Sequence, residues 1–74
     1  MKYEINQLVR VKRSSDREFF EDTTAKHIPF AGRYAVVYSV HPSDRKQDAV
    51  YLIQIQGYPN ATYFIPEDEL ENVE

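Results

Sequence analysis

Residues 49–70 read AVYLIQIQGYPNATYFIPEDEL, and this stretch predicts a β-hairpin followed by one short acidic turn. The first strand is expected over 49–56, because that segment is rich in the β-branched and aromatic residues that suit a pleated surface. Its alternate positions share one face of the strand. The expected core of the domain therefore includes Tyr51, Ile53 and Ile55.

The rest of the stretch predicts a turn, a second strand and a stop. A turn is expected over 57–60, because Gly and Asn tolerate positive φ and Pro fixes φ near a turn value. Strand composition resumes over 61–65, and Pro66 ends that strand because it has no backbone donor. One helical or 3₁₀ turn is expected over 67–69, where acidic groups favour the start of the turn. Leu70 then returns to the core.

The composition limits the chemistry that this chain can carry. The chain has 74 residues, six Tyr, four Phe and no Cys, with a net charge of −3. A disulfide framework, a thiolate metal site and a cysteine nucleophile are therefore excluded. We expect one domain over 1–74 with a small, aromatic-rich core. No apolar run reaches the length of a membrane span, and the absence of a secretion signal predicts a cytoplasmic location.

The charges divide unevenly along the chain. Residues 1–46 hold all nine Lys and Arg side chains and six acids, whereas residues 47–74 hold six acids and no base. The distribution permits two interpretations. It describes an ordinary solvated surface of mixed sign, or a dipolar domain whose two ends select different partners.

Three further strands are expected, over 7–13, 33–40 and 70–73. In the first, Val9 and Val11 face the core. The strand over 33–40 is apolar on both faces and is expected to lie at the centre of the sheet.

The segment 14–32 is long for a loop inside a small domain, and such loops are usually functional or contain structure of their own. Its Ser and Asp residues predict a capped helical turn over 17–22. At least two of its bulky apolar side chains are expected to tuck under the segment, and the others become candidates for a binding surface. These side chains are Phe19, Phe20, Ile28 and Phe30.

The order of strands and connections resembles the SH3-like small barrel. The residues that carry this resemblance are Leu8-Val9-Arg10-Val11, Ala31-Gly32 ahead of Ala35-Val36-Val37, Tyr51-x-Ile53-x-Ile55-x-Gly57, and the closing Ile65-Pro66-Glu67-Asp68-Glu69-Leu70-Glu71. The closing motif is similar to the one that ends many small bacterial and phage-encoded SH3-like proteins, and the PsaE subunit of photosystem I and KOW-type domains have a similar plan. The resemblance implies an all-β, five-stranded barrel with a long first loop and a 3₁₀ turn before the last strand. It implies no single function, because small barrels serve many roles.

The sequence offers no catalytic or metal-binding constellation. His27 and His41 are the only histidines and belong to different expected loops, whereas a metal site needs several converging ligands. His41 lies near Ser43 and Asp44, but a catalytic triad is defined by geometry and not by sequence neighbours. The acids at 67–69 are expected to be a solvated turn. We therefore predict no enzyme activity, no metal and no cofactor.

The favoured hypothesis is a non-catalytic protein-interaction module or accessory subunit, encoded by a bacterium, a phage or a mobile element, whose partner is another protein. Its candidate binding residues are the aromatic side chains of the long loop, the turn and the outer face of the hairpin. They are Phe19, Phe20, Phe30, Tyr58 and Phe64. On the hairpin face that carries Phe64, the sequence leaves open whether another layer covers the apolar side chains or whether they form an exposed patch.

The alternative hypothesis is a small nucleic-acid-binding barrel. Basic side chains on one face would contact phosphates, with Tyr34 or Tyr38 stacking on bases. The net negative charge disfavours this hypothesis, because phosphate contacts supply most non-specific affinity. The candidate residues are Arg10, Lys12, Arg13, Arg33, Arg45 and Lys46.

Overall fold

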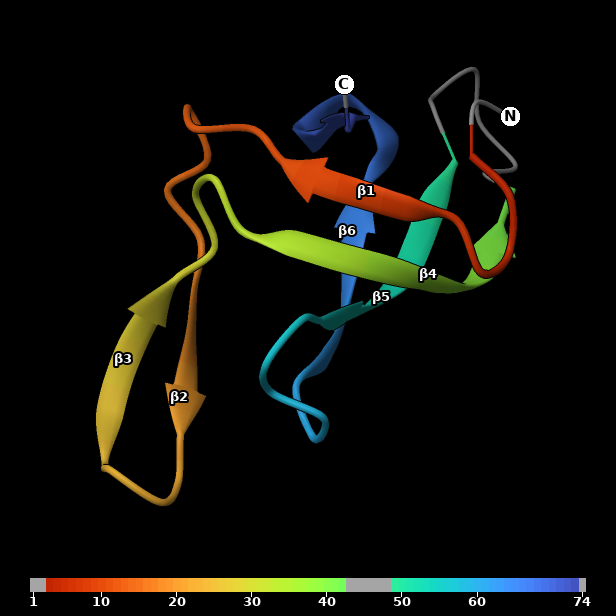
Figure 1. Ribbon diagram of the computed structural model, residues 1–74. Coiled ribbons are helices and arrows are strands. Elements are labelled where there is room, and N and C mark those ends of the chain that lie inside the picture. Colours follow the sequence, from red (N-terminus) through yellow and green to blue (C-terminus); the bar gives the residue numbers. More distant parts are fainter. Residues whose placement is uncertain (1–2, 43–48, 74) are drawn as a thin grey trace.

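The computed structural model describes residues 3–42 and 49–73. In these residues the chain forms seven strands and one 3₁₀ turn (Figure 1). In chain order they are β1 (Leu8–Val11), β2 (Glu18–Glu21), β3 (Lys26–Pro29), β4 (Tyr34–His41), β5 (Val50–Ile55), β6 (Thr62–Pro66), η1 (Glu67–Glu69) and β7 (Leu70–Asn72). The predicted all-β class is confirmed. No helix within the described residues has the length and apolar character needed to cross a membrane.

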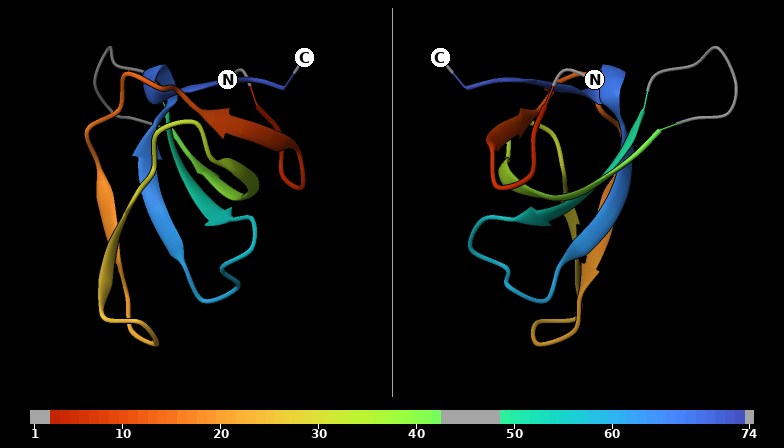
Figure 2. Two further views of the ribbon diagram at one scale, coloured as in Figure 1. Left: turned by 60° about the vertical axis from the view of Figure 1, so that its left-hand side comes forward. Right: turned by 90° about the vertical axis from the view of Figure 1, so that its right-hand side faces the viewer.

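The strands form a five-stranded antiparallel sheet and a separate two-stranded hairpin. The order in the larger sheet is β6-β5-β4-β1-β7, so β4 lies at its centre as predicted. Among the described residues no ladder joins β6 to β7, so hydrogen bonding does not close this sheet into the expected barrel. The register between β4 and β5 shifts between Val37 and Ser39, which is the irregularity that bends and twists a sheet. Figure 2 shows the resulting curl.

The inner face of the curled sheet holds the core. Tyr51, Ile53 and Ile55 are fully buried on β5, which confirms the period-two prediction for this strand. Val9 and Val11 on β1 are also fully buried, as predicted. Burial at alternate positions of neighbouring strands is what gives an antiparallel sheet one apolar face.

The segment between β1 and β4 is a β-hairpin, so the helical turn predicted over 17–22 is wrong. β2 and β3 pair in register, with Phe19 opposite Ile28 and Phe20 opposite His27. Phe19 is buried whereas Phe20 is half exposed, which is the alternation of a strand. The tertiary packing of the buried Phe19 side chain therefore outweighs the local capping signal, since local propensity is only a weak predictor of secondary structure.

A buried polar chain joins the lead-in segment, residues 3–7 ahead of β1, to β5 and η1. Tyr51 donates its phenolic hydrogen to Glu67, a carboxylate that is only 6% exposed. The Tyr3 N–H donates to the Tyr51 oxygen at 3.2 Å, and the Tyr3 hydroxyl donates to the Leu70 carbonyl at 3.1 Å. Burial raises the pKa of the Tyr3 phenol above its ordinary value, and the Glu67 charge adds to this rise. The 3₁₀ turn thus begins where the sequence predicts it and is fixed to the core by its first residue.

Candidate functional site

The candidate binding aromatics separate into buried and exposed side chains. Phe19 and Phe30 are each 3% exposed, which confirms that at least two apolar groups of the long segment tuck under it. Phe20 is 50% exposed and Phe64 is 57% exposed. Phe20 on β2 and Phe64 on β6 therefore remain as the accessible members of the predicted set, together with the partly buried Tyr58.

A groove of about 460 Å³ lies between β2 and the β5–β6 turn, which spans residues 56–61. Its walls are residues 19–23 on the hairpin and residues 57–61 on the turn, and Tyr63 of β6 completes it. We call this feature the aromatic groove. Figure 1 shows the hairpin tip and the β5–β6 turn at the same end of the molecule. The structure thus brings Phe19, Phe20 and Tyr58 together at one site.

The base of the aromatic groove is a cluster of packed rings. The Phe19 ring lies 5.2 Å from Tyr58 in an edge-to-face arrangement and 5.7 Å from Tyr63, measured between ring centroids. Phe30 lies beneath, 5.3 Å from Phe19 and 5.4 Å from Tyr63. The Arg33 guanidinium stands 5.4 Å from the centre of the Tyr58 ring. Because each ring is held by others, the base of the groove is formed before any ligand arrives.

The turn wall is held by its own backbone hydrogen bonds. The Tyr58 N–H donates to the Ile55 carbonyl at 3.1 Å, and the Ala61 N–H donates to the Tyr58 carbonyl at 2.9 Å. Gly57 has a φ of 90°, which an L side chain rarely adopts. The Gln54 amide donates to the Pro59 carbonyl at 2.8 Å. The predicted turn is confirmed, and it presents Tyr58 to the groove.

The hairpin wall carries negative charge. Among the described residues that line the aromatic groove, Glu21 and Asp22 are the only charged ones. The Glu21 carboxylate accepts the Thr24 hydroxyl at 2.6 Å and the Thr23 N–H at 2.9 Å, and these bonds lower its pKa below the ordinary value. Glu21 therefore stays ionised at neutral pH, and its charge is fixed in position by the hairpin turn.

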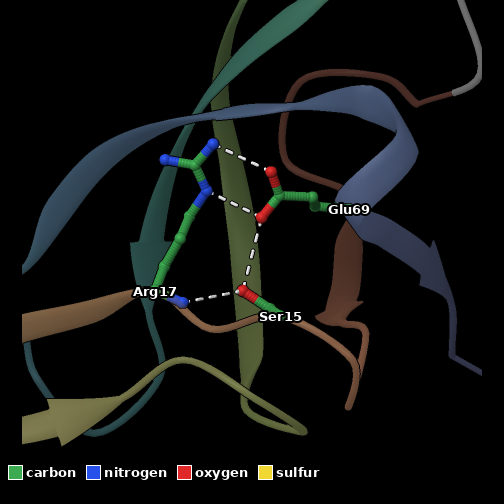
Figure 3. A network of polar contacts seen from close by, with 3 residues as sticks. All are labelled: Ser15, Arg17 and Glu69. Carbon is green, nitrogen blue, oxygen red and sulfur yellow. Dashed lines mark hydrogen bonds and ion pairs between the residues drawn. The ribbon is translucent and has the colours of Figure 1, made fainter.

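A small polar network fastens the base of the hairpin to η1 (Figure 3). Arg17 donates to both carboxylate oxygens of Glu69, from Nε at 2.7 Å and from Nη2 at 2.8 Å. The Ser15 hydroxyl donates to the same carboxylate at 3.3 Å and accepts the Arg17 N–H at 3.3 Å. The Arg17 hydrogen bonds lower the pKa of Glu69 below its ordinary value. This contact links the hairpin wall of the groove to the main sheet.

We expect Arg17→Met to loosen the hairpin. The pair is solvent-exposed, so the free energy of unfolding at neutral pH should fall by only about 0.5 kcal/mol. Because the folded pKa of Glu69 is lowered, the stabilisation is present above the ordinary Glu pKa and is lost as the pH falls through the folded pKa. Amide hydrogen exchange should show faster exchange over residues 18–29 at pH 7 and no difference from the wild type in acid.

Arg10→Met is the matched control for this variant. Arg10 pairs with Glu71 at 2.5 Å on the sheet and is not part of the Arg17–Glu69–Ser15 network. Its removal should leave the exchange of residues 18–29 unchanged. Equal hairpin exchange in the two variants would contradict the anchoring role of Arg17.

Three basic side chains of the alternative hypothesis contact other groups of the described chain. Arg10 lies against Glu71, whose hydrogen bonds and charge raise the Arg10 pKa and locally compensate its charge. Arg33 instead donates to the Pro29 carbonyl at 2.8 Å, and its guanidinium stands over the Tyr58 ring. The Arg13 side chain packs beside Gly32, with its Cγ 3.7 Å from the position that a Cβ would take there. The remaining candidates are Lys12, at the end of β1, and Arg45 and Lys46, which lie outside the described residues.

Phe64 lies apart from the aromatic groove, on the outer face of the sheet. It pairs with Leu52 across β5 and β6, and its ring lies 5.2 Å from the His41 ring. Val50 and Leu52 on the same face are half-buried, while Phe64 is exposed. This face is therefore covered in part along β5 and open at β6.

The histidines lie at separate places. His27 is on β3, beside the exposed Phe20 ring, and His41 ends β4 with its Nε2 2.8 Å from the Ser39 hydroxyl. Ser43 and Asp44, which sequence proximity grouped with His41, lie outside the described residues. Within the part of the chain that the structure describes, no three His, Asp or Glu side chains converge as metal ligands.

Sequence reasoning did not identify three contributors to the groove. Tyr63 lies on the strand expected over 61–65, and it packs against the core while one part of it lines the groove. Glu21 and Asp22 were expected within a helical turn. The overlooked signal is the pair of strand-favouring aromatic residues, Phe19 and Phe20, followed by Thr23-Thr24, which fits a strand and its turn.

No protein family, no curated protein and no solved structure matches this chain.

Proposed function

We propose that this chain is a non-catalytic protein-interaction module and that it binds a segment of another protein in the aromatic groove. The observation that carries the proposal is the exposed Phe20 beside a preformed base of packed rings. Binding hot spots are enriched in aromatic side chains that fill or line pockets. The groove is lined mainly by aromatic and small residues, with two carboxylates at one wall. This composition fits a polypeptide segment better than a nucleic acid, whose phosphates both carboxylates would repel.

The arrangement of the strands supports an SH3-like plan for the module. The features that support this proposal are the long connection between β1 and β4, the turn over residues 57–60 and the 3₁₀ turn before the last strand. β4 lies between β1 and β5 in the curled sheet and pairs with both strands. We further propose that the protein works as an accessory subunit in a bacterial or phage setting, inside the cytoplasm.

The test is capture from a lysate of the native host with the tagged chain, with and without nuclease, eluted in a salt gradient. Two variants, Phe20→Ser and Phe64→Ser, replace aromatic side chains of the same type and similar exposure at different places. We expect a protein partner that survives nuclease, is lost with Phe20→Ser by about tenfold in yield, and is retained with Phe64→Ser.

Two results would overturn the proposal. The first is recovery of nucleic acid that elutes with rising salt, because that behaviour identifies phosphate binding. The second is a partner whose yield falls only with Phe64→Ser, because that partner binds the outer face of the sheet. Folding of both variants is checked by thermal unfolding, and each is expected to keep a cooperative transition, since both side chains are exposed.

A further inference from the structure

The hairpin wall of the aromatic groove is a strand edge. Residues 19–23 line the groove without interruption. Side chains of consecutive strand residues point to opposite faces, so a surface that met only one face would contact alternate residues. A run of five consecutive lining residues means that the groove follows the backbone of β2 and the hairpin tip along their edge.

The backbone N–H and C=O groups on the outer edge of β2 itself have no partner in the described part of the chain. β2 forms a ladder only with β3, and the Phe30 N–H donates to the Arg17 carbonyl at 3.0 Å. Hydrogen-bonded pairs alternate along an antiparallel ladder, so Phe19 and Glu21 also bond toward β3. Glu18 faces Pro29, which has no N–H to give, in agreement with that alternation. Glu18 and Phe20 therefore direct their N–H and C=O groups away from β3. Phe20 lines the groove, and Glu18 lies one residue before its lining.

We propose that the aromatic groove takes its ligand as an added β-strand, which hydrogen-bonds to the free edge of β2 at Glu18 and Phe20. The ligand is an extended polypeptide segment that alternates apolar with basic side chains. This inference rests on the proposed function and specifies its binding mode. Strand addition obtains affinity from main-chain hydrogen bonds and specificity from alternate side chains of the ligand. The edge of β2 offers the backbone groups for the first, and the groove offers contacts for the second.

The chemistry of the occupant follows from the walls. Apolar side chains on one face of the added strand meet the rings of Phe19, Tyr58 and Tyr63. Basic side chains on the other face lie near Asp22, and the fixed charge of Glu21, on the face of Phe19, adds to the negative potential of this wall.

The test uses a seven-residue peptide of alternating valine and lysine, acetylated and amidated, and two isomers of it. One isomer carries N-methyl groups on the amides along one edge, and the other carries the same number along the opposite edge. A peptide added at the edge of β2 pairs with it along only one of its own two edges. One isomer should therefore bind about tenfold or more weakly than the parent peptide, and the other should bind like the parent. Binding is followed by NMR, and the Glu18 and Phe20 amides should shift on titration.

Two aspartate variants, one inside the groove and one outside it, test the contribution of charge. Asp22→Asn should weaken the parent peptide about threefold, with a reduced salt dependence. Asp68→Asn removes an equally exposed carboxylate from η1, outside the groove, and should change nothing.

The outcomes separate the binding mode from the function. If the two methylated isomers bind alike, or if the shifts fall on the amides of β6, strand addition to β2 is overturned. The capture experiment with Phe20→Ser can still succeed in that case, and the groove then binds its partner through side chains alone. If none of the three peptides binds at about millimolar concentration, strand addition by an apolar and basic segment is also overturned. If the captured partner is indifferent to Phe20→Ser, the proposed function itself fails.

Discussion

Phe19→Ala is expected to lower the free energy of unfolding by about 3–4 kcal/mol, the usual cost of truncating a buried Phe. The ring is 3% exposed and packs against Phe30, Tyr58 and Tyr63. Its loss leaves a cavity between the hairpin and the sheet, and the surrounding rings can relax into that cavity only in part. The variant should also lose the base of the aromatic groove. Urea unfolding followed by circular dichroism measures the first effect.

Phe20→Ala is the control for this prediction, because it makes the same chemical change one residue further along the same strand. Phe20 is 50% exposed, so its truncation should cost less than about 1 kcal/mol. Equal losses of stability in the two variants would contradict the assignment of Phe19 to the core. They would equally contradict a strand at this position, since a strand directs neighbouring side chains to opposite faces.

Tyr51→Phe is expected to lower the free energy of unfolding by about 1–3 kcal/mol, although it removes a single oxygen. Tyr51 is fully buried, and its hydroxyl both donates to Glu67 and accepts the Tyr3 N–H. Its removal takes one donor from a buried carboxylate and the acceptor from a buried N–H. Unfolding of the lead-in segment and of η1 should therefore precede that of the hairpin in native-state hydrogen exchange.

The control for Tyr51→Phe is Tyr63→Phe, which removes the same oxygen from a half-buried ring. The Tyr63 hydroxyl makes no hydrogen bond to another described residue. This change should alter stability by less than about 0.5 kcal/mol. The double variant Tyr51→Phe, Glu67→Gln should recover part of the loss, because a neutral amide is less costly to bury than a carboxylate. Failure of Tyr51→Phe to destabilise the protein would contradict the buried polar chain.

The sequence predicts the main sheet well because its strands are bounded by residues with strong local effects. Pro66 ends β6, Gly57 forms the turn with a positive φ, and period-two burial fixes the face of β5. These signals are local, and they agree with the tertiary packing. The central position of β4 could also be predicted, since both of its faces carry apolar side chains.

The hairpin is not predicted from the sequence, because its two strands are short and a helix-capping signal competes with the strand signal at Phe19 and Phe20. Ser15 resembles a cap residue, yet its hydroxyl serves the Arg17–Glu69 contact, which joins residues 52 positions apart. The aromatic groove depends on that hairpin, so its lining residues could be suspected singly from the sequence but not assembled. Only the paired strands show that Phe19 lies under the groove while Phe20 stands at its wall.

The most direct test of the aromatic groove as a binding site is photo-crosslinking from two single positions. A photoreactive phenylalanine analogue replaces Phe20 in one sample and Phe64 in the other, and each protein is irradiated in lysate of the native host. We predict a crosslinked protein from position 20, retained after nuclease treatment, and none of comparable yield from position 64. Crosslinks to the same protein from position 64 alone, or to nucleic acid from either position, would contradict the account.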